Sequence, residues 1–242
     1  MSIANNQRLG DLVREQTATD IKRVLTDMEN LFLSVYRWIN NSCQRTHQSV
    51  ALVNILSSSG QYLRVAADNL EGHVSVLALA TRSLYELNVR IRAILASDDQ
   101  MQNWLSEVVT DKIQTLEGLL ALDTLTEMNA EREVLRKETA RLNALREKYK
   151  MPTIKKPADA GIIAPTVGLA NEHKALFKLF SKLVHPSSYL TNSYKNAASA
   201  EVRAILQMHA QLYAWDTFNR ICDAQSVPEA QRSLNAGIAG HE

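Results

Sequence analysis

Hydrophobic residues recur along this chain at intervals of three and four, which is the period of an amphipathic α-helix. The segment that begins at His73 shows the pattern most clearly, because its apolar residues fall on one continuous stripe. That stripe contains Leu77, Ala80, Leu84, Leu87, Ile91 and Ile94. No segment alternates between apolar and polar residues as a half-buried strand would. The sequence therefore predicts an all-α fold.

The same periodicity gives approximate bounds for the individual helices. We expect helices over residues 18–41, 48–70, 73–97, 100–122, 126–149, 169–185 and 198–225. The run Ser57-Ser-Ser-Gly60 is expected to interrupt the second of these. The last carries a wide apolar surface around Tyr213 and Trp215, so it should pack heavily.

Proline divides the chain. None occurs before Pro152, and Pro157 and Pro165 follow within a short stretch. Because proline removes a backbone donor and clashes with the preceding turn, residues 151–168 are expected to form a long connecting loop. We therefore expect one helical domain over residues 1–242, with a flexible tail at its end. Its parts would be a bundle core (18–97 and 169–225), a helical hairpin arm (100–150), the connecting loop (151–168) and the tail (226–242).

The segment before the prolines is dense in charge and has a narrow apolar seam. Apolar or aromatic residues recur there every seven positions, at Met128, Leu135, Leu142 and Tyr149. The companion positions of a coiled coil are mostly polar, so the seam is only one residue wide. This pattern favours an arm that packs antiparallel to residues 100–122, although a self-associating coiled coil remains an alternative.

Composition indicates a globular protein without a strong overall charge. The 242 residues are 45% hydrophobic, and 27 Lys and Arg face 26 Asp and Glu, so the net charge of +1 gives no global attraction to nucleic acid or membrane. Cys43 and Cys222 have no paired spacing, and the N-terminus lacks an apolar signal core. The most apolar stretch is much shorter than the roughly 20 residues of a membrane helix. We expect a cytoplasmic protein with no membrane contact.

A first candidate site lies where the helix over 169–185 ends. His185 closes that helix, Pro186 stops it, and Ser187, Ser188 and Tyr189 follow with three hydroxyl groups. These hydroxyls offer several hydrogen-bond donors to an anion or a ribose. The string therefore predicts a substrate-binding site at the end of this helix.

The same helix carries a basic stripe. Lys174, Lys178 and Lys182 are spaced four apart, and Ser181 borders the stripe one turn before His185. The alternative interpretation is a solvated lysine face with a histidine at the helix C-terminus, where positive charge complements the helix dipole. On the opposite face, an apolar stripe includes His173. We expect that histidine to lie in the core or in a dimer contact.

A second candidate site is the string Arg82-Ser-Leu-Tyr-Glu86, on the helix that begins at His73. Arg82 and Glu86 lie nearly opposite the apolar stripe, yet Leu79 and Val89 lie beside them, so this face is not simply solvated. The pair is either an ordinary ion pair, worth only tenths of a kcal/mol when exposed, or part of a site. We expect Arg82, Glu86 and His185 to share one cleft.

The two strings together resemble those of the HEPN superfamily of compact all-α domains, and within it a poorly described bacterial branch. The resemblance covers about residues 60–230 and rests on Arg82-Ser-Leu-Tyr-Glu86 and on Ser181-Lys-Leu-Val-His185-Pro-Ser. Many HEPN proteins are metal-independent ribonucleases whose arginine and histidine lie on one helix with four to six residues between them and act across a dimer. The resemblance then implies that His185 is the general acid or base and that a cation stabilises phosphate charge. In this chain Lys178 stands where those proteins have the arginine. Arg82, from the other helix, could instead supply the guanidinium group.

Two functions of different class follow from this resemblance. One is a metal-independent endoribonuclease, as a toxin-like or phage-defence effector. The other is a non-catalytic HEPN-like module that binds a nucleotide, RNA or a protein partner. We expect a homodimer and no cofactor. The six histidines lack metal-ligand spacing, and there is no glycine-rich phosphate loop, so we expect no metal site.

Overall fold

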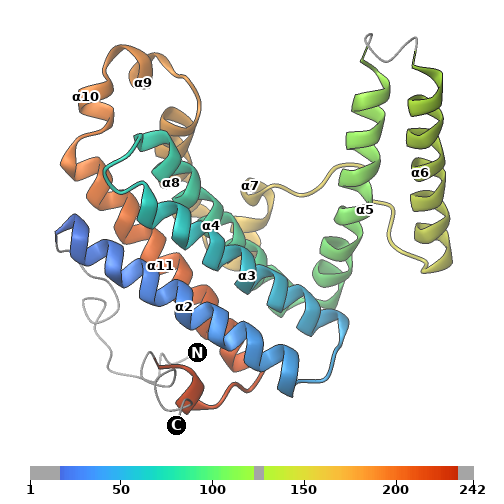
Figure 1. Cartoon of the computed structure of the whole chain (residues 1–242), viewed down its shortest axis with the longest axis horizontal. Helices are drawn as coiled ribbons and strands as arrows, with labels where there is room; N and C mark the ends of the chain where they lie inside the picture. Colours follow the sequence, from blue (N-terminus) through green and yellow to red (C-terminus); the bar gives the residue numbers. More distant parts are fainter. Residues whose placement is uncertain (1–16, 123–127, 234–242) are drawn as a thin grey trace.

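A computed structural model describes residues 17–122 and 128–233, and both ranges are helical and contain no strand. Figure 1 shows a helical bundle from which a hairpin of two helices projects. The all-α fold with a projecting hairpin is therefore confirmed. The expected start of the hairpin's second helix lies partly outside the described residues.

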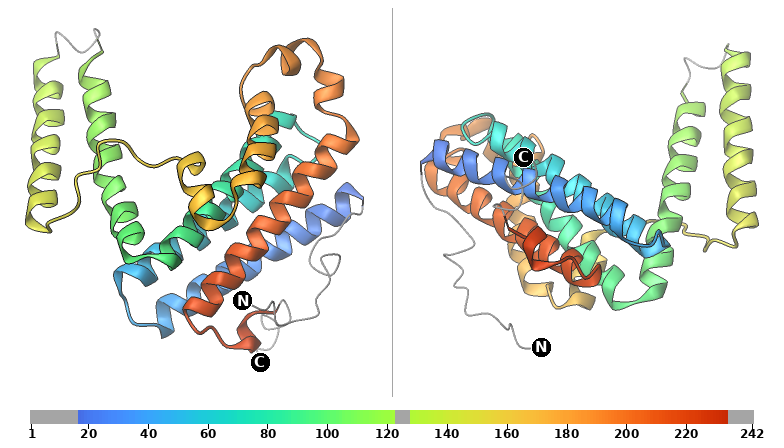
Figure 2. Two further views of the ribbon diagram at one scale, coloured as in Figure 1. Left: turned by 180° about the vertical axis from the view of Figure 1, so that it is seen from behind. Right: turned by 60° about the horizontal axis from the view of Figure 1, so that its bottom comes forward.

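Five helices form the bundle, and α4 lies at its centre. α4 contacts α3, α8 and α11, while α2 packs against α3. The two views in Figure 2 show these helices running alongside one another. Their largest fully buried side chains include Tyr85, Phe32, Phe180 and Phe218. The bundle helices are α2 (Ala18–Ser42), α3 (His47–Asp68), α4 (Val74–Ala96), α8 (Ala170–Val184) and α11 (Ala200–Ala224).

Side-chain caps explain where these helices begin. The hydroxyls of Thr17 and Ser199 accept hydrogen bonds from backbone N–H groups in the first turns of α2 and α11. At the start of α3, Thr46 and Ser49 form a reciprocal capping box. Such caps satisfy N–H groups that have no partner inside the helix, so the sequence fixes the starts locally.

The expected interruption of α3 at Ser57-Ser-Ser-Gly60 is wrong, because the helix is continuous through this run. Ser59 and Gly60 are both buried, and Gly60 faces α2. A Cβ atom at Gly60 would lie 3.7 Å from the Cβ of Phe32. Packing against α2 therefore holds this run in the helix and outweighs the helix penalty of glycine, about 1 kcal/mol.

The arm consists of α5 (Asp98–Leu120) and α6 (Asn129–Lys148), which lie side by side (Figure 1). It has a small core of its own, formed by Val109, Ile113 and Leu142. Leu142 is the one residue of α6 that is buried. Of the four seam residues read from the sequence, Leu142 is therefore the one that the hairpin buries, whereas Met128 and Tyr149 are exposed.

The connection between arm and bundle is more regular than the expected loop. It contains α7 (Ala160–Ile163) and a short 3-10 helix, η2 (Ala164–Val167). Asp159 caps α7, and Pro165 lies in the first turn of η2, where its missing N–H has no intrahelical partner to lose. Gly168 ends the segment with a φ of 79°, in the left-handed region that favours glycine.

Three further short elements were not expected from the periodicity. They are α9 (Ser188–Asn192), α10 (Tyr194–Ala197) and the 3-10 helix η3 (Glu229–Gln231). The described part of the expected flexible tail is held in place, because Arg232 donates to the carbonyl oxygens of Val227 and Cys222 and pairs with Asp223. Residues 234–242 of that tail lie outside the described residues.

Candidate functional site

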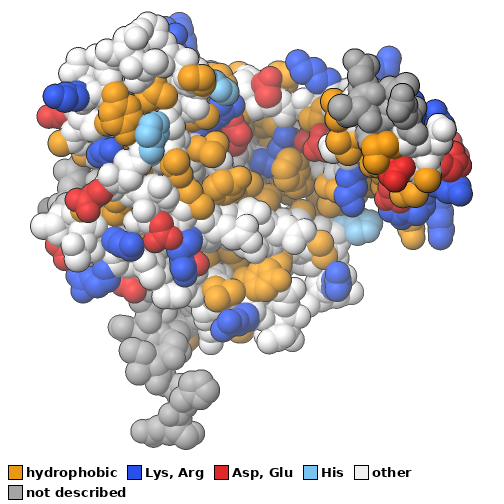
Figure 3. Space-filling model, turned by 45° about the horizontal axis from the view of Figure 1, so that its top comes forward, with side chains coloured by type: hydrophobic (Ala, Val, Ile, Leu, Met, Phe, Trp, Pro, Cys, Tyr) orange, Lys and Arg blue, Asp and Glu red, His pale blue; other side chains and the backbone are white. Residues whose placement is uncertain are grey.

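A cleft of about 320 Å³ lies where the arm joins the bundle. Helices α3, α4, α5 and α7 and the segment before α7 all contribute to its walls. Figure 3 shows apolar, acidic and basic side chains together in the hollow between bundle and arm. The lining residues are Tyr62, Arg82, Ser83, Glu86, Leu87, Val89, Arg90, Trp104, Ala158, Asp159, Ala160 and Ile163.

Arg82 and Glu86 both line this cleft, one turn apart on α4. Arg82 Nε donates to Glu86 Oε1 at 2.8 Å. The Arg82 guanidinium carbon also lies 4.9 Å from the centre of the Phe177 ring on α8, a cation–π contact. The side chain of Arg82 is 23% exposed and that of Glu86 is 40% exposed, so this ion pair borders solvent and is not buried in the core. The terminal nitrogens of Arg82 have no hydrogen-bond partner among the described residues.

Arg90 and Trp104 join the cleft to the arm. Arg90 Nη2 lies 3.1 Å from Glu107 Oε2 on α5 and donates to the Ala158 carbonyl at 2.7 Å. Its guanidinium carbon lies 4.4 Å from the centre of the Trp104 ring. Burial lowers the pKa of Arg90 and raises the pKa of Glu107, while the attraction between the two charges opposes both shifts. One buried guanidinium thus connects α4, α5 and the segment before α7.

Sequence reasoning missed this part of the cleft. Arg90 follows Glu86 by one turn of α4, so the helical period alone indicated that it lies on the same side. Its carboxylate partner is 17 residues away on another helix. Only the angle between α4 and α5 brings these two residues together.

His173 lies in an aromatic cluster between α4, α8 and α11. Its Nδ1 is 2.9 Å from the hydroxyl of Tyr85, and its ring stacks on Phe177 with a centroid distance of 4.7 Å. Tyr213 donates its hydroxyl proton to Glu172 at 2.6 Å. Burial raises the pKa of both tyrosines. His173 therefore contributes to the packing of the bundle, which agrees with the expectation that it lies in the core.

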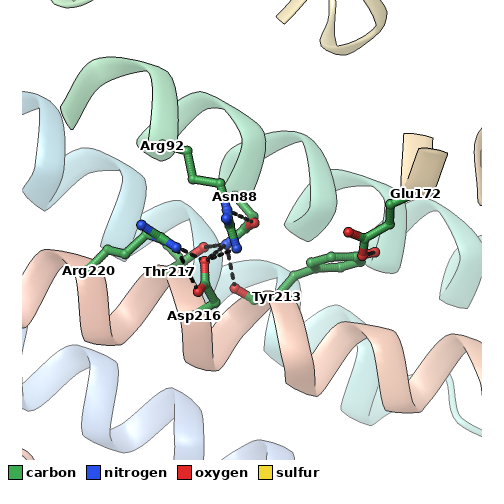
Figure 4. Close-up of polar contacts among 7 residues, drawn as sticks. All are labelled: Asn88, Arg92, Glu172, Tyr213, Asp216, Thr217 and Arg220. Carbon is green, nitrogen blue, oxygen red and sulfur yellow. Dashed lines mark hydrogen bonds and ion pairs between the residues drawn. The ribbon is translucent and has the colours of Figure 1, made fainter. Parts of the chain in front are cut away.

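Figure 4 shows a second polar cluster, in which Asp216 of α11 receives bonds from three side chains. Asn88 and Arg92 of α4 donate to Oδ2 at 2.7 and 2.9 Å, and Arg220 donates to both carboxylate oxygens. Burial favours the neutral acid, but the bonds from Arg220, Asn88 and Arg92 prevail and lower the pKa of Asp216. Because both carboxylate oxygens are bonded, this cluster fastens α4 to α11.

His185 does not line the cleft that contains Arg82 and Glu86. It is exposed at the C-terminal end of α8. It follows Phe177 by eight residues, so at 1.5 Å per residue it lies about 12 Å farther along the helix axis. The expected grouping of three residues therefore fails within this cleft, because one turn of α8 contacts Arg82 and another carries His185.

The hydroxyl groups around His185 have local structural roles instead of forming an open pocket. Ser187 donates to the Lys182 carbonyl at 2.7 Å and accepts from the N–H of Leu190, so it closes α8 and caps α9. Ser181 donates to the Lys178 carbonyl, and Ser188 accepts from Asn192. Tyr189 is exposed. The side chains of Lys178 and Lys182 are exposed and form no ion pair among the described residues.

One arginine–histidine pair with the spacing that the resemblance implies went unnoticed in the sequence. Arg203 and His209 lie on α11 with five residues between them. Arg203 donates to the carbonyl oxygens of Leu70, Gly72 and Ala198, which fastens α11 to the turn between α3 and α4. His209 Nδ1 is 2.7 Å from the Ile205 carbonyl. Arg203 is therefore committed to a structural role.

The described residues contain no group of three or more His, Cys, Asp or Glu side chains placed to hold a metal ion. None of the described helices is long and apolar enough to cross a membrane. Comparison with protein families matches residues 70–200 to a family of unknown function, DUF5677. No curated protein and no solved structure matches the chain. The matched range includes α4, the arm, α7 and α8, and hence most of the cleft.

Proposed function

The chain belongs to the DUF5677 family, whose function is unknown, and we propose that this protein is a non-catalytic HEPN-like module that binds a protein partner in the cleft between bundle and arm. One observation carries the proposal. The cleft has a largely apolar and aromatic lining, and each of its two arginines is already paired with a carboxylate.

This arrangement supports binding better than RNA cleavage. Metal-independent cleavage needs a proton donor or acceptor within hydrogen-bond reach of the reacting phosphate, together with a cation that stabilises its charge. In one copy of the chain, Arg82 lies in the cleft while His185 lies farther along α8, outside it. The exposed Lys178 and Lys182 are not joined to His185 by any contact among the described residues.

The lining also favours a protein partner over a nucleotide. Tryptophan, tyrosine and arginine are enriched where proteins bind one another, and here they occur together as Trp104, Tyr62 and Arg82. Phosphate sites instead use helix N-termini, glycine-rich loops or arginines whose charge is available to the ligand. A segment of a partner protein that places one side chain in the cleft suits its volume and its apolar walls.

A peptide library panned against the full chain tests the proposal. Enriched peptides should bind the native protein in solution and lose at least tenfold in affinity with Ser83→Trp, whose indole would fill the cleft. Leu79→Trp is the matched control, because Leu79 lies one turn earlier on α4, is 46% exposed and does not line the cleft. Circular dichroism would verify that both variants fold.

The same purified protein also tests the alternative function, a ribonuclease. We expect no RNA cleavage in EDTA, and no change with His185→Ala. Cleavage in EDTA that His185→Ala abolishes would overturn the proposal in favour of the ribonuclease. Peptides that bind Ser83→Trp as well as they bind the native chain would show that the cleft is not the binding site.

A further inference from the structure

We infer that the partner group that enters the cleft is a basic side chain, an arginine or a lysine. This inference rests on the proposed function, since it names the chemistry of the group that the cleft takes. It follows from the charge of the cleft, from two carboxylate oxygens that lack partners, and from the shape of the apolar lining.

The charged residues that line the cleft, together with the ion-pair partner of Arg90, leave an excess of one negative charge. Arg82 and Arg90 are the lining cations, and Glu86 and Asp159 are the lining carboxylates. Glu107, on α5, pairs with Arg90 and balances its charge. The lining therefore keeps one further guanidinium, Arg82, beside the two carboxylates. Lys155 and Lys156 precede Ala158 in the chain but do not line the cleft. A cation is therefore favoured over an anion.

Two carboxylates at the cleft each have one oxygen without a hydrogen-bond partner among the described residues. Glu86 uses Oε1 for Arg82, and Asp159 uses Oδ1 for the N–H of Ile162 at the start of α7. The side chain of Glu86 is 40% exposed and Asp159 is exposed, so a ligand can reach both. Hydrogen bonds between a carboxylate and a cationic donor are among the strongest in proteins.

The apolar walls fit the aliphatic part of such a side chain. Leu87, Val89 and Ile163 line the cleft together with the rings of Tyr62 and Trp104. Arginine and lysine bury their methylene chains against surfaces of this kind while their charged ends reach polar groups. The terminal nitrogens of Arg82, which have no hydrogen-bond partner among the described residues, can donate to a backbone carbonyl of the same segment. A peptide offers both a cationic side chain and a backbone carbonyl, whereas a free cation offers no carbonyl.

Matched peptides test this inference on the full chain. The probes are pentapeptides, blocked at both ends, that carry arginine, lysine, norleucine or glutamate at the central position between leucine and alanine residues. Binding is followed by NMR chemical shifts and by isothermal titration. We expect the arginine and lysine peptides to bind at least tenfold more tightly than the norleucine peptide, and the glutamate peptide to bind most weakly.

The double variant Glu86→Gln, Asp159→Asn removes both carboxylates while it keeps side-chain shape, and asparagine remains a good helix cap for α7. It should abolish the preference for arginine over norleucine and leave the norleucine affinity within about twofold. Glu138→Gln, on α6 and outside the cleft lining, is the control for a general loss of negative charge.

The outcomes separate this inference from the proposed function. If arginine and norleucine peptides bind equally and both lose affinity with Ser83→Trp, the cleft binds peptides but the basic side chain is wrong. A preference for glutamate would overturn the inference by showing an anion site. If none of the peptides binds at millimolar concentration and panning also yields no ligand of the cleft, both proposals fail.

Discussion

Arg90 of α4 and Glu107 of α5 form an ion pair of 3.1 Å that is almost completely buried, with side chains 11% and 5% exposed. Arg90 also donates to the carbonyl of Ala158 and lies over the ring of Trp104. This pair therefore holds the arm, the bundle and the segment before α7 together at the base of the cleft. The shape of the cleft therefore depends on this pair.

Glu107→Gln should destabilise the protein strongly, because it leaves the Arg90 guanidinium buried without a counter-charge. Loss of one member of a buried pair typically lowers the free energy of unfolding by about 3–5 kcal/mol. Urea denaturation followed by circular dichroism measures this change. The double variant Arg90→Met, Glu107→Leu should recover much of the loss, since it removes both charges.

The exposed pair between Glu138 and Arg141 on α6 provides the control for that prediction. Its hydrogen bonds are shorter, at 2.7 Å, yet its side chains are 59% (Arg141) and 39% (Glu138) exposed. Glu138→Gln should leave the denaturation midpoint almost unchanged. Equal effects of Glu107→Gln and Glu138→Gln would contradict the role given to burial.

Two glycine substitutions should have opposite effects. A Cβ atom at Gly161 would lie 3.1 Å from both Asp159 Oδ1 and His173 Nε2, and both groups are held by other contacts. Gly161→Ala should therefore cost about 1 kcal/mol or more. Gly118 on α5 has no atoms within 4 Å of such a Cβ, so Gly118→Ala should add about 0.5–1 kcal/mol to stability. Thermal melts of both variants check the two signs.

The contribution of Asp216 should depend on pH in acid. Its folded-state pKa lies below the ordinary value of 3.8, so the ionised carboxylate stabilises the fold above that pH. This contribution is lost as the pH falls through the lowered folded value. The stability difference between the native chain and Asp216→Asn should therefore be constant above about pH 5 and shrink below about pH 4. A constant difference in urea denaturation down to about pH 3 would contradict this.

Replacing Ser187 should lower the stability of the fold, whereas replacing His185 should not. Ser187→Ala removes the hydroxyl that caps α9 and binds the Lys182 carbonyl, and loss of such a cap costs about 0.5–2 kcal/mol. His185→Ala removes an exposed side chain and should leave the melting temperature nearly unchanged. The opposite order of effects would mean that the imidazole holds the end of α8.

Periodicity and proline usage determined the helices to within a few residues, as α4 and α11 show. Helical spacing and caps are local properties, so the sequence alone expresses them. Where the sequence reading was wrong, tertiary packing was the cause. α3 continues through Gly60 because α2 packs against it, and α7 forms within a proline-bearing segment because it docks beside α4 and α8. The homodimer and the cytoplasmic location stay predictions.

The candidate site, like the fold, was determined partly by the sequence and partly by the tertiary structure. The sequence placed Arg82 and Glu86 on one face of α4, because residues four apart in a helix always share a face. It could not place His185, Glu107 or Trp104 relative to that pair, since their positions depend on how α5 and α8 cross α4. Packing of apolar surfaces sets those crossings, and they join residues far apart in the chain. The sequence alone therefore determined the face of α4 that borders the cleft, and only the tertiary structure decided which residues complete it.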